Sequence, residues 1–500
     1  MKAVWRATVL PVTHTLTRLS QRRCVGLWHH NLTVDQKALA AELEEPLLAH
    51  LRKRGLVAQT TSEDLEELLQ KTKVGLYCGA DPTARSLHLG NLLPLMILLH
   101  FNVRGHDVTG LVGGATGAVG DPSGRTTERT AMEEQTRLNN VEKIKAQMKG
   151  FFVSGVRYVK SISMQKIIEE GKIESRNNFE WWKDMTLLEF LATYGRHIRV
   201  SQMLARDSVK GRLESENGIG FNEFTYQILQ AYDFWYLFRN HNVSIQVGGN
   251  DQWGNITAGV DLITRLKGVL NQDKKDKEAQ RIAGRASFGL TVPLLTTASG
   301  EKFGKSAGNA VFIDSEITPS FDLYQYFIKT PDSEVEKLLK IFTFLPLSQI
   351  ESIMSMHNQD PAYRNAQRVL ANEVTDLIHG VGSGKHAAVV SSILYPLPDQ
   401  PYPDTSSEML INSFEKANIL KTVDGEKFLD QPFSALVAEL HGCSKKEAKK
   451  FVSNGAVYIG YDRLRVDPSD SVLLSRDQLI DGKLLLMRIG KSTYHVAQVL

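Results

Sequence analysis

The sequence predicts an α/β fold in which helices cover a largely parallel sheet. Residues 74–80, VGLYCGA, form a short apolar run that ends in a turn signal, and a helical pattern follows over residues 92–101. Residues 108–124, VTGLVGGATGAVGDPSG, are a second apolar strand that leads into a glycine-rich loop, and residues 244–248, SIQVG, are predicted as a further strand that leads into a turn at residues 249–251. Because apolar strands alternate with helical segments, we expect parallel strands joined by crossover helices.

The other elements follow from the same patterns. Pro94 falls in the first turn of the helix that begins near Leu92, where its missing N–H has no partner in any case. Residues 128–240 are largely helical in pattern, and residues 291–295 return to the sheet. Residues 320–392 are again helical and carry no obvious chemistry, which is typical of a packing domain.

Length and composition set bounds on the kind of protein. With 500 residues, 42% of them hydrophobic, the chain is long enough for roughly two to four domains. No stretch approaches 18 consecutive apolar residues, so we expect no membrane span. The net charge of +3 and the pI near 8.5 indicate nucleic-acid binding only if the basic residues cluster. Cys24, Cys78 and Cys443 are too few for a disulfide framework or a zinc site, which favours a reducing compartment.

Residues 1–34 are basic, rich in hydroxyl side chains, and precede the first acidic residue, Asp35. This composition predicts a mitochondrial transit peptide. A secretory signal is a rival interpretation, but Arg6, Pro11 and His14 interrupt any apolar core. A disordered basic tail without an address is the other alternative.

Residues 299–306, SGEKFGKS, end like a phosphate-binding P-loop. In that motif a glycine stands five residues before the second glycine, but Ser299 takes its place here. A P-loop kinase is therefore disfavoured. Lys302 and Lys305 still indicate a loop that binds phosphate, so the groups that stand opposite these lysines decide the function.

Residues 81–91, DPTARSLHLGN, lie between a predicted strand end and a predicted helix start. Ligands of open α/β sheets bind at the carboxyl ends of the strands, and a helix N-terminus attracts anions. Thr83 and His88 are thus placed to donate hydrogen bonds to a phosphate. A histidine taken alone more often has a surface or capping role, but its pairing with the lysine loop about two hundred residues later favours a phosphate site.

Five blocks of sequence stand in the order and spacing of one enzyme family. They are YCGADPTARSLHLGN, LVGGATGAVGDPSG, EFTYQILQAYDF, QVGGNDQWGNITAG and EKFGKS. The first and last correspond to the His-x-Gly-His and Lys-Met-Ser-Lys-Ser signatures of the class I aminoacyl-tRNA synthetases. From about residue 75 to its end, the chain resembles the tyrosyl-tRNA synthetases of the bacterial type. The resemblance implies a tyrosine–tRNA ligase activity with L-tyrosine, ATP and mitochondrial tRNA(Tyr) as substrates.

The resemblance also implies a domain plan. Behind a transit peptide at 1–34, a Rossmann-like catalytic domain with a parallel sheet spans residues 36–315, and an α-helical domain spans 316–394. A linker at 395–425 begins with four prolines in thirteen residues, which exclude a helix there. Residues 426–500 form a small α+β S4-like RNA-binding domain. Members of the family are homodimers, and the transit peptide places this one in the mitochondrial matrix.

The tyrosine pocket of the family corresponds to five residues. Tyr77 and Asp233 would hold the phenolic hydroxyl group of the substrate, while Tyr226, Gln230 and Asp121 would hold its ammonium group. Tyr226, Gln230 and Asp233 stand at i, i+4 and i+7 among apolar neighbours, so part of this polar helix face is expected to be buried and to need partners. A solvated polar stripe is the alternative interpretation. Tyrosyl-tRNA synthetases reject phenylalanine at this site without editing, so we expect no editing domain.

The remaining site residues concern ATP. Gly249, Asp251 and Gln252 would bind the ribose and α-phosphate region, and Cys78 would contact the ribose, although a free cysteine is more often a small buried apolar residue. The full ATP set is Cys78, Gly79, Asp81, His88, Gly90, Gly249, Asp251, Gln252 and Lys305. The tyrosine carboxylate attacks the α-phosphate directly, so catalysis consists of alignment and stabilisation of phosphate charge. The groups implied for that charge are Thr83, His88, Asn91, Lys302, Lys305 and Ser306.

Some features depart from the family pattern or add to it. Asn91 stands where the first signature usually ends in histidine, although asparagine can still donate a hydrogen bond. Phe303 and Gly304 replace the methionine and serine of the general class, a form that the bacterial-type tyrosyl enzymes share. The insertion at about 271–281 is predicted to be a solvated surface segment. The sequence contains no pattern of a protein metal site, so Mg²⁺ is expected to arrive with ATP.

The C-terminal domain contains a helix with a clear start. Ser444 and Glu447 form a capping box, the helix is predicted to stop near Asn454, and a strand follows at residues 457–459. The segment resembles the S4 module, whose short basic helix contacts the RNA backbone, which gives salt-dependent affinity without reading bases. A solvated helix face is the alternative interpretation. The lysines implied for RNA binding are Lys445, Lys446, Lys449 and Lys450.

A different class of function is a non-catalytic or dual-role RNA-binding protein on a synthetase scaffold. The retained pocket residues and both phosphate loops favour an enzyme. A second RNA-related role alongside catalysis remains open on the sequence.

Overall fold

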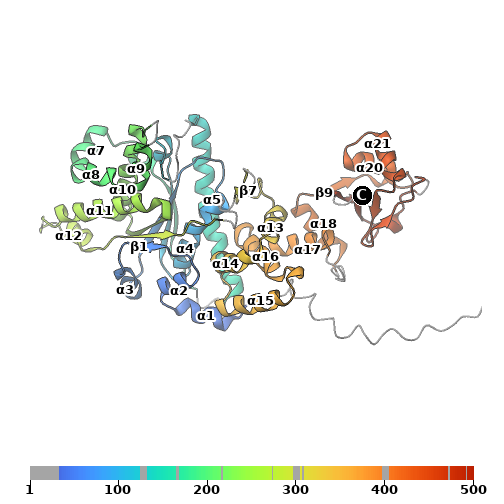
Figure 1. Cartoon of the computed structure of the whole chain (residues 1–500), viewed down its shortest axis with the longest axis horizontal. Coiled ribbons are helices and arrows are strands. Elements are labelled where there is room, and N and C mark those ends of the chain that lie inside the picture. The colour runs from blue at the N-terminus through green and yellow to red at the C-terminus, as the bar shows by residue number, and fades with distance from the viewer. Residues whose placement is uncertain are drawn as a thin grey trace, which may run out of the picture.

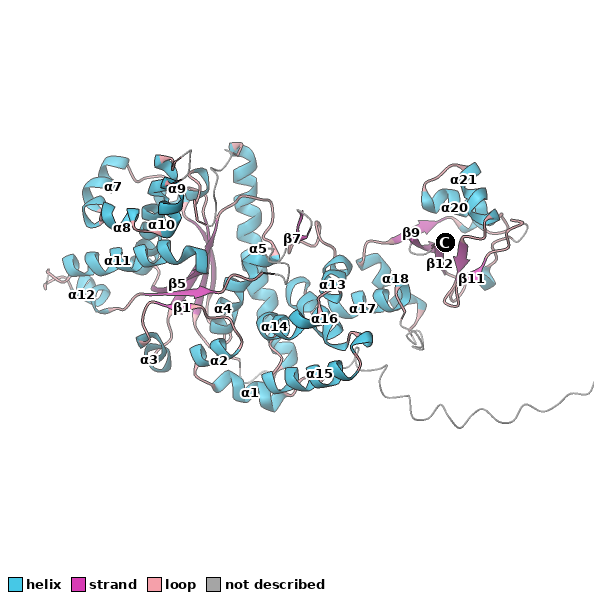
Figure 2. Ribbon diagram, in the orientation of Figure 1, coloured by secondary structure: helices cyan, strands magenta, loops and turns pink. Residues whose placement is uncertain are grey.

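The computed structural model describes most of the chain from residue 33 onward (Figure 1). An α/β part, a helical part and a small α+β unit follow one another along the chain (Figure 2). Residues 1–32 lie outside the described residues, so the transit peptide stays a prediction. Within the described part of the chain, no helix is long and apolar enough to cross a membrane. The described ranges are 33–123, 132–164, 168–214, 218–272, 274–296, 305–306, 309–396, 405–470, 473–490 and 493–500.

Six strands form the main sheet in the order β1-β6-β5-β2-β3-β4. Strands β2 to β6 run parallel, and β1 lies antiparallel to β6 at one edge. The predicted α/β fold with a parallel sheet is therefore confirmed. The strands are β1 (Gln59–Thr60), β2 (Gly75–Ala80), β3 (Asp107–Val112), β4 (Ile173–Asn177), β5 (Val243–Gly249) and β6 (Phe288–Val292).

Two strands differ from the sequence prediction. The last parallel strand, β6, begins at Phe288, earlier than the predicted start at residue 291. Strand β4 lies inside residues 128–240, which were predicted to be largely helical. Its sequence IESRN has no apolar run, and all five of its residues are half-buried because the strand lies at an edge of the sheet. A polar edge strand lacks the periodic signal by which the buried strands were found.

Helices cover both faces of this sheet. Leu76 and Val108 face the side that α4 and α5 cover, whereas their neighbours Tyr77 and Leu111 face the side that α10 and α11 cover. Pro94 lies in the first turn of α4, as predicted. The helices of this part are α1 (Gln36–Glu44), α2 (Leu47–Lys53), α3 (Asp64–Lys71), α4 (Leu92–Asn102), α5 (Glu134–Ile162), α6 (Phe179–Trp182), α7 (Leu187–Thr193), α8 (Val200–Leu204), α9 (Asp207–Leu213), α10 (Phe221–Asn240), α11 (Trp253–Leu270) and α12 (Lys277–Gly284).

The insertion at 271–281 is more ordered than the predicted solvated segment. The Asp276 side chain accepts hydrogen bonds from the Glu278 and Ala279 amides and so caps α12. Ala279 and Ile282 are buried where α12 packs on α11, while all charged residues of the insertion that the structure describes are exposed, as predicted. A short amphipathic helix therefore holds the insertion against the sheet domain.

The predicted helical region after the sheet is confirmed, and the long helix α5 packs against it. Its apolar core is continuous with that of the sheet, because one cluster of buried residues extends from Leu76 through Phe152 to Leu370. The helices are α13 (Ser320–Ile328), α14 (Asp332–Phe342), α15 (Leu347–Gln359), α16 (Asn365–His379) and α17 (Ser383–Leu394).

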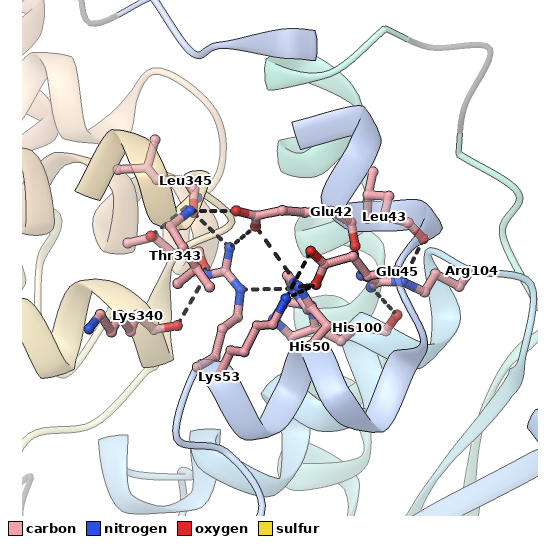
Figure 3. A network of polar contacts seen from close by, with 12 residues as sticks. Glu42, Leu43, Glu45, His50, Lys53, His100, Arg104, Lys340, Thr343 and Leu345 are labelled. Atoms are coloured by element: carbon pink, nitrogen blue, oxygen red, sulfur yellow. Dashed lines mark hydrogen bonds and ion pairs between the residues drawn. The ribbon is translucent and has the colours of Figure 1, made fainter. Parts of the chain in front are cut away.

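A network of polar contacts joins the helices α1 and α2 to this helical region (Figure 3). Arg54, 1% exposed, donates to the backbone carbonyls of Lys340 (3.1 Å), Thr343 (2.8 Å) and Leu345 (2.7 Å) at the end of α14. It also donates to the Glu42 carboxylate at 3.1 Å. The guanidinium group thus supplies donors to carbonyls at a helix C-terminus, and Glu42 supplies its counter-charge.

The fifth N–H of the same guanidinium group goes to a histidine. Arg54 Nε donates to His50 Nε2 at 2.9 Å, so all five of its donors have an acceptor. Burial, with a smaller contribution from the neighbouring Arg54, lowers the pKa of His50 to about 2. His50 is therefore a neutral acceptor at every physiological pH, and the network contains no competing positive charge on the imidazole.

The C-terminal unit is an α+β structure around a sheet of order β11-β10-β12-β13-β9. The predicted capping box of α21 is confirmed, since Glu447 N donates to Ser444 Oγ and Ser444 N donates to the Glu447 carboxylate. The helix ends at Ser453, capped by Asn454, and β10 follows as predicted. The elements are α18 (Ser407–Lys416), β9 (Leu420–Val423), α19 (Gly425–Phe428), α20 (Phe433–His441), α21 (Lys445–Ser453), β10 (Val457–Ile459), β11 (Leu464–Arg465), β12 (Leu484–Ile489) and β13 (Thr493–Val499).

The predicted linker at 395–425 is shorter than expected. Residues 397–404 lie outside the described residues, but α18 and β9 follow within the predicted range. Leu410 and Phe414 of α18 are buried against α17, and β9 pairs in parallel with β13. The prolines at the start of the segment obscured the amphipathic pattern of α18, which begins at Ser407.

Candidate active site

A cavity of about 380 Å³ opens where β2 and β5 end. The chain continues from β2 to β3 and β4 on one side and places β5 and β6 on the other, so the strand order reverses between β2 and β5. Open α/β sheets bind ligands at such a switch point. The predicted site residues that line this cavity are Tyr77, Gly79, Asp81, Thr83, His88, Gly90, Asn91, Asp121, Tyr226, Gln230, Asp233, Gly249, Asp251 and Gln252.

Cys78 is the predicted ATP-site residue whose side chain lies elsewhere. It is 3% exposed and packs in the core beneath α4 and α5, on the face of β2 opposite to Tyr77. Burial raises the pKa of its thiol to about 12. The structure thus gives Cys78 the environment of a small buried apolar residue and brings no part of its side chain to the cavity.

The predicted lysine loop is described only in part. Lys302 lies outside the described residues. Lys305 and Ser306 form the short strand β7 (Lys305–Ser306), which pairs with β8 (Asn309–Ala310), but their side chains are not among those described. Their roles toward phosphate therefore stay predictions.

The chain just beyond β8 is bonded to the first signature. The Leu89 amide donates to the carbonyl of Val311 at 3.0 Å, and the Ile313 amide donates to the carbonyl of Leu87 at 2.9 Å. These two bonds flank His88, which forms an isolated bridge with Phe312. The chain that follows the lysine loop, at residues 311–313, is therefore joined through its backbone to the first signature, which lines the cavity.

His88 caps the short 3-10 helix Leu89–Asn91 that precedes α4. Its Nδ1 accepts from the Gly90 amide at 3.0 Å, and its own amide donates to Asn91 Oδ1 at 3.0 Å. Because Nδ1 is an acceptor here, the neutral ring carries its proton on Nε2. Asn91 uses its oxygen in this reciprocal cap, which leaves the Nδ2 of its amide as the group able to donate.

Tyr77 and Asp233 line the cavity from β2 and α10 and are 1% and 2% exposed. The Tyr77 hydroxyl group is buried without a hydrogen-bond partner among the described residues, so a ligand that supplies one would fit here. Asp233 Oδ1 accepts from the indole N–H groups of Trp181 (2.8 Å) and Trp182 (2.7 Å), and Oδ2 accepts from Asn178 Nδ2 (2.9 Å). Burial raises the pKa of Asp233 to about 7, and the three donors oppose that rise.

Carboxylates also line the cavity around Tyr226. The Tyr226 hydroxyl group donates to Asp81 at 3.2 Å from Oδ1 and 3.1 Å from Oδ2, and Thr116 Oγ1 donates to Asp81 Oδ1 at 3.3 Å. The Asp121 carboxylate lines the same wall. An ammonium group only donates hydrogen bonds, so a site with several carboxylates and other oxygen acceptors is suited to bind it.

Amides connect the rest of the predicted pocket. Gln252 Nε2 donates to Asp121 Oδ2 at 2.7 Å, and Gln230 Nε2 donates to Gln252 Oε1 at 3.3 Å. Asn255 Nδ2 lies 3.1 Å from Gln230 Oε1 and 3.4 Å from Asp121 Oδ1. These contacts fix the side chains in the middle of α10 and at the start of α11 relative to each other.

Sequence reasoning missed five residues of this site. Asn255 belongs to the block QVGGNDQWGNITAG, so its place in a family motif was a signal that could have found it. Trp181 and Trp182 form a rare tryptophan pair, but the helical prediction for residues 128–240 gave them no chemistry. The residues missed are Thr116, Asn178, Trp181, Trp182 and Asn255.

A Rossmann-like sheet with a cavity at its switch point, bounded by a His-x-Gly segment that is bonded to a lysine-loop segment, defines a class I aminoacyl-tRNA synthetase. The sequence model of the family "tRNA synthetases class I (W and Y)" matches residues 69–395. The chain belongs to this family and, within it, to the tyrosyl-tRNA synthetases of the bacterial and mitochondrial type.

The relatives support this assignment over most of the chain. The mitochondrial tyrosine–tRNA ligase of Saccharomyces cerevisiae is 48% identical over 457 residues, which are 91% of this chain and 89% of the relative. The tyrosine–tRNA ligase of Lactobacillus johnsonii is 39% identical and covers 91% of this chain and 99% of its own length. The crystal structure of a C-terminally truncated mitochondrial tyrosyl-tRNA synthetase from Coccidioides posadasii matches with a TM-score of 0.61 at 40% identity, covering 71% of this chain and 94% of that one.

Proposed function

We propose that this enzyme is a tyrosine–tRNA ligase that works in two steps in the cavity between β2 and β5. In the first step an oxygen of the tyrosine carboxylate bonds to the α-phosphorus of ATP, the bond to the β-phosphate breaks, and pyrophosphate leaves. In the second step a hydroxyl group at the 3′ end of mitochondrial tRNA(Tyr) attacks the tyrosyl carbonyl carbon, and AMP leaves. Both steps need alignment and charge stabilisation and no protein nucleophile.

The unpartnered hydroxyl group of Tyr77 beside the acceptor Asp233 is the observation that carries this proposal. A phenol bonded to both would satisfy the buried hydroxyl and an acceptor site of the carboxylate, whereas phenylalanine would leave both without a partner. The ammonium group of the substrate would lie among Tyr226, Gln230 and Asp121, on the acidic wall.

The ATP end of the cavity lies toward the signatures. His88 Nε2–H, the Thr83 hydroxyl group and the Asn91 amide are the donors proposed for the phosphate charge from one side, with Lys302, Lys305 and Ser306 proposed from the other. The nucleotide itself would lie against the strand-end turns, where small residues admit it and polar side chains bind it. The residues proposed for it are Gly79, Asp81, Gly90, Gly249, Asp251 and Gln252.

Mg²⁺ is proposed to enter with ATP and to neutralise phosphate charge when bound. Among the described residues, no group of three or more His, Cys, Asp or Glu is arranged to hold a metal ion. Asp81, Asp121 and Asp251 line the cavity, so single carboxylates are near enough to bind a phosphate-held ion directly or through water.

The function is tested by exchange of labelled pyrophosphate into ATP by the full chain without tRNA. We expect exchange with tyrosine and none above background with phenylalanine or tryptophan. Addition of tRNA(Tyr) should then give tyrosyl-tRNA. Folded protein that shows no exchange with tyrosine, or equal exchange with phenylalanine, would contradict the proposed function.

The C-terminal unit is proposed to be an S4-like domain that binds the tRNA backbone. The four lysines of α21 are exposed, and Glu447 is the acidic residue among them, used in the cap. A second surface with net positive charge is a small groove beside α8 and α11, lined by Arg199, Arg206 and Arg265 and by one carboxylate, Asp261, which lies 3.8 Å from Arg206. Both positive surfaces suit the phosphates of one RNA.

Removing the charge of α21 should weaken tRNA binding and leave tyrosine activation intact. With all four lysines changed to alanine, we expect a weaker Kd for tRNA(Tyr) and a salt dependence whose slope falls by about 0.9 for each phosphate that is no longer neutralised. Filter binding at several salt concentrations measures both quantities. The matched control changes the same lysines to arginine, which keeps the charge and should keep the slope. An unchanged slope in the alanine variant would exclude this surface as an RNA-binding surface.

A homodimer is proposed on the evidence of exposed apolar residues at one end of the sheet domain. They lie on the neighbouring short helices α7, α8 and α9 and at the start of α10, which gather together in Figure 1. Exposed apolar groups of this size are typical of surfaces that another protein covers. The residues are Leu187, Leu188, Leu191, Val200, Leu204, Leu213 and Phe221.

Phe221→Asp should shift the enzyme from dimer to monomer. Phe221 is 80% exposed in the single chain, and a charge there would have to be desolvated in an apolar interface. Sedimentation velocity at micromolar concentration measures the shift. Leu464→Asp is the matched control, because Leu464 is also exposed but lies on β11, far along the chain in the C-terminal unit. A wild-type chain that sediments as a monomer would exclude the dimer.

The enzyme is placed in the mitochondrion, and we propose the matrix as its compartment. The basic, acid-free segment at residues 1–34 and the mitochondrial tyrosine–tRNA ligases among its relatives support this placement. Import of the full chain into isolated mitochondria, with protease protection of the processed product after outer-membrane rupture, tests it.

A further inference from the structure

The Asp233 carboxylate is held by an arrangement that the proposed chemistry does not by itself require. Two consecutive tryptophans, at the end of the four-residue helix α6, direct both of their indole N–H groups to the same atom, Asp233 Oδ1. The third donor, Asn178, stands just before the same helix and bonds Oδ2. One short turn after β4 therefore supplies all three of these donors to the carboxylate.

The two indoles leave the two carboxylate oxygens unequal. A carboxylate oxygen has about two lone-pair sites, so the two N–H groups occupy both sites of Oδ1. Oδ2 has one site taken by Asn178 and one left. Only Oδ2 of Asp233 can therefore accept a further hydrogen bond from a phenol in the cavity.

The ring contacts hold both indoles in place. Trp181 stacks on Tyr236 with ring centroids 4.4 Å apart. Trp182 lies edge-on to Tyr232 at 4.9 Å and tilted against Phe190 at 5.4 Å. Because Tyr232 and Tyr236 belong to α10, the helix that carries Asp233, the indoles and the carboxylate cannot shift independently.

We propose that Trp182 is a positioning residue for substrate selection: with Trp181 it saturates Asp233 Oδ1 and so presents Oδ2 to the phenolic hydroxyl group of tyrosine. The inference rests on the proposed function, because it concerns the same pocket. Trp182 does not line the cavity, so its effect on the substrate is transmitted through Asp233. The tryptophan pair thereby contributes to the choice between a phenol and a benzene ring.

The proposal also fixes the direction of a pH effect. Burial favours the protonated form of Asp233, and donors to Oδ1 favour the ionised form, which is the acceptor that a phenol needs. The titratable groups that face this carboxylate are Asp81, Tyr77, Tyr226 and Tyr232. Loss of one indole donor should therefore move the acid limb of kcat/KM for tyrosine to higher pH.

Trp182→Phe tests the proposal, because it keeps an aromatic ring and removes the N–H donor together with part of the indole, a loss of volume that the control below shares. In pyrophosphate exchange with the full chain, we expect KM for tyrosine to rise about tenfold to a hundredfold, kcat to change little, and the tyrosine-to-phenylalanine ratio of kcat/KM to fall by a similar factor. Trp181→Phe should do the same, which keeps the test valid if one variant folds poorly. Trp235→Phe, a buried tryptophan on α10 that stacks on Phe238, is the matched control.

The outcomes separate this inference from the proposed function. A wild-type enzyme without tyrosine-dependent exchange would overturn the function itself. An active wild type whose Trp182→Phe and Trp181→Phe variants keep the tyrosine-to-phenylalanine ratio and the acid limb would overturn only the positioning role. A KM that rises equally in the Trp235→Phe control would also overturn it, because the effect would then come from packing.

Discussion

His88→Ala should lower the rate of tyrosyl-adenylate formation about 100- to 1,000-fold while changing KM for tyrosine little. His88, in the first signature, lines the cavity. Its Nδ1 accepts a hydrogen bond from the Gly90 amide, so the neutral imidazole carries its proton on Nε2. A preorganised donor to charge that develops on a phosphate in the transition state contributes on this scale when the site excludes water. Single-turnover formation of the adenylate, measured by quench flow with saturating tyrosine and ATP, gives the rate directly.

A second variant separates this chemistry from the capping role of the same residue. His88 closes a reciprocal cap with Asn91, so alanine also removes a helix cap, which is worth about 1 kcal/mol of stability. His88→Asn keeps a good capping residue but withdraws the imidazole. We expect a stability near the wild type and a rate still well below it. Rates within about threefold of the wild type in both variants would exclude His88 as a donor to the phosphates.

Arg54→Met should lower the free energy of unfolding by about 3–5 kcal/mol. Removing the guanidinium group leaves Glu42 and three carbonyls at the end of α14 buried without their donor, and breaking a buried pair from one side has a cost of this size. The methionine fills much of the volume, so the loss reports the polar contacts more than a cavity. Urea denaturation followed by tryptophan fluorescence measures the change.

The matched control lies two residues earlier on the same helix. Arg52 donates to Glu63 at 2.7 Å, but both side chains are largely exposed, and pairs of this kind contribute less than about 1 kcal/mol. Arg52→Met should therefore leave the unfolding midpoint almost unchanged. An equal decrease in the free energy of unfolding in the two variants would show that the buried network contributes no more to stability than the exposed ion pair.

The strands that could be predicted from the sequence are those that are buried on both faces of the sheet. Strands β2, β3 and β5 each contain a continuous run of buried, mainly apolar residues because helices cover both of their faces. Strand β4 has one neighbour and polar side chains, so its sequence resembles the helical segments around it. The same limit applies to α18, whose apolar buried residues follow a proline-rich stretch.

For the site, the residues that could be predicted from the sequence are those that belong to family motifs. The family motifs identified Tyr77, Asp233 and His88, and the structure brings them to one cavity. No sequence pattern identifies the partners of Asp233, because a tryptophan pair about fifty residues away meets it only after α6 has folded onto α10. For Cys78 the motif predicted a role that the structure does not support. Successive side chains of a strand point to opposite faces of the sheet, so the side chain of Cys78 points into the core although its neighbour Tyr77 lines the cavity. Motifs locate a site, and the fold decides which side chains reach it.

The Arg54 network also bears on the order of folding. Arg54 meets its three carbonyl partners across 286, 289 and 291 residues of chain. A contact between residues so far apart in sequence forms only after the chain between them has lost the conformational entropy of loop closure. We therefore expect these contacts to form late in folding. Helices α1 and α2 therefore cannot complete their packing until the residues near 345 are available. A chain that emerges N-terminus first, from a ribosome or through a translocation pore, therefore leaves α1 and α2 without their final packing partners until the region around residue 345 has also emerged.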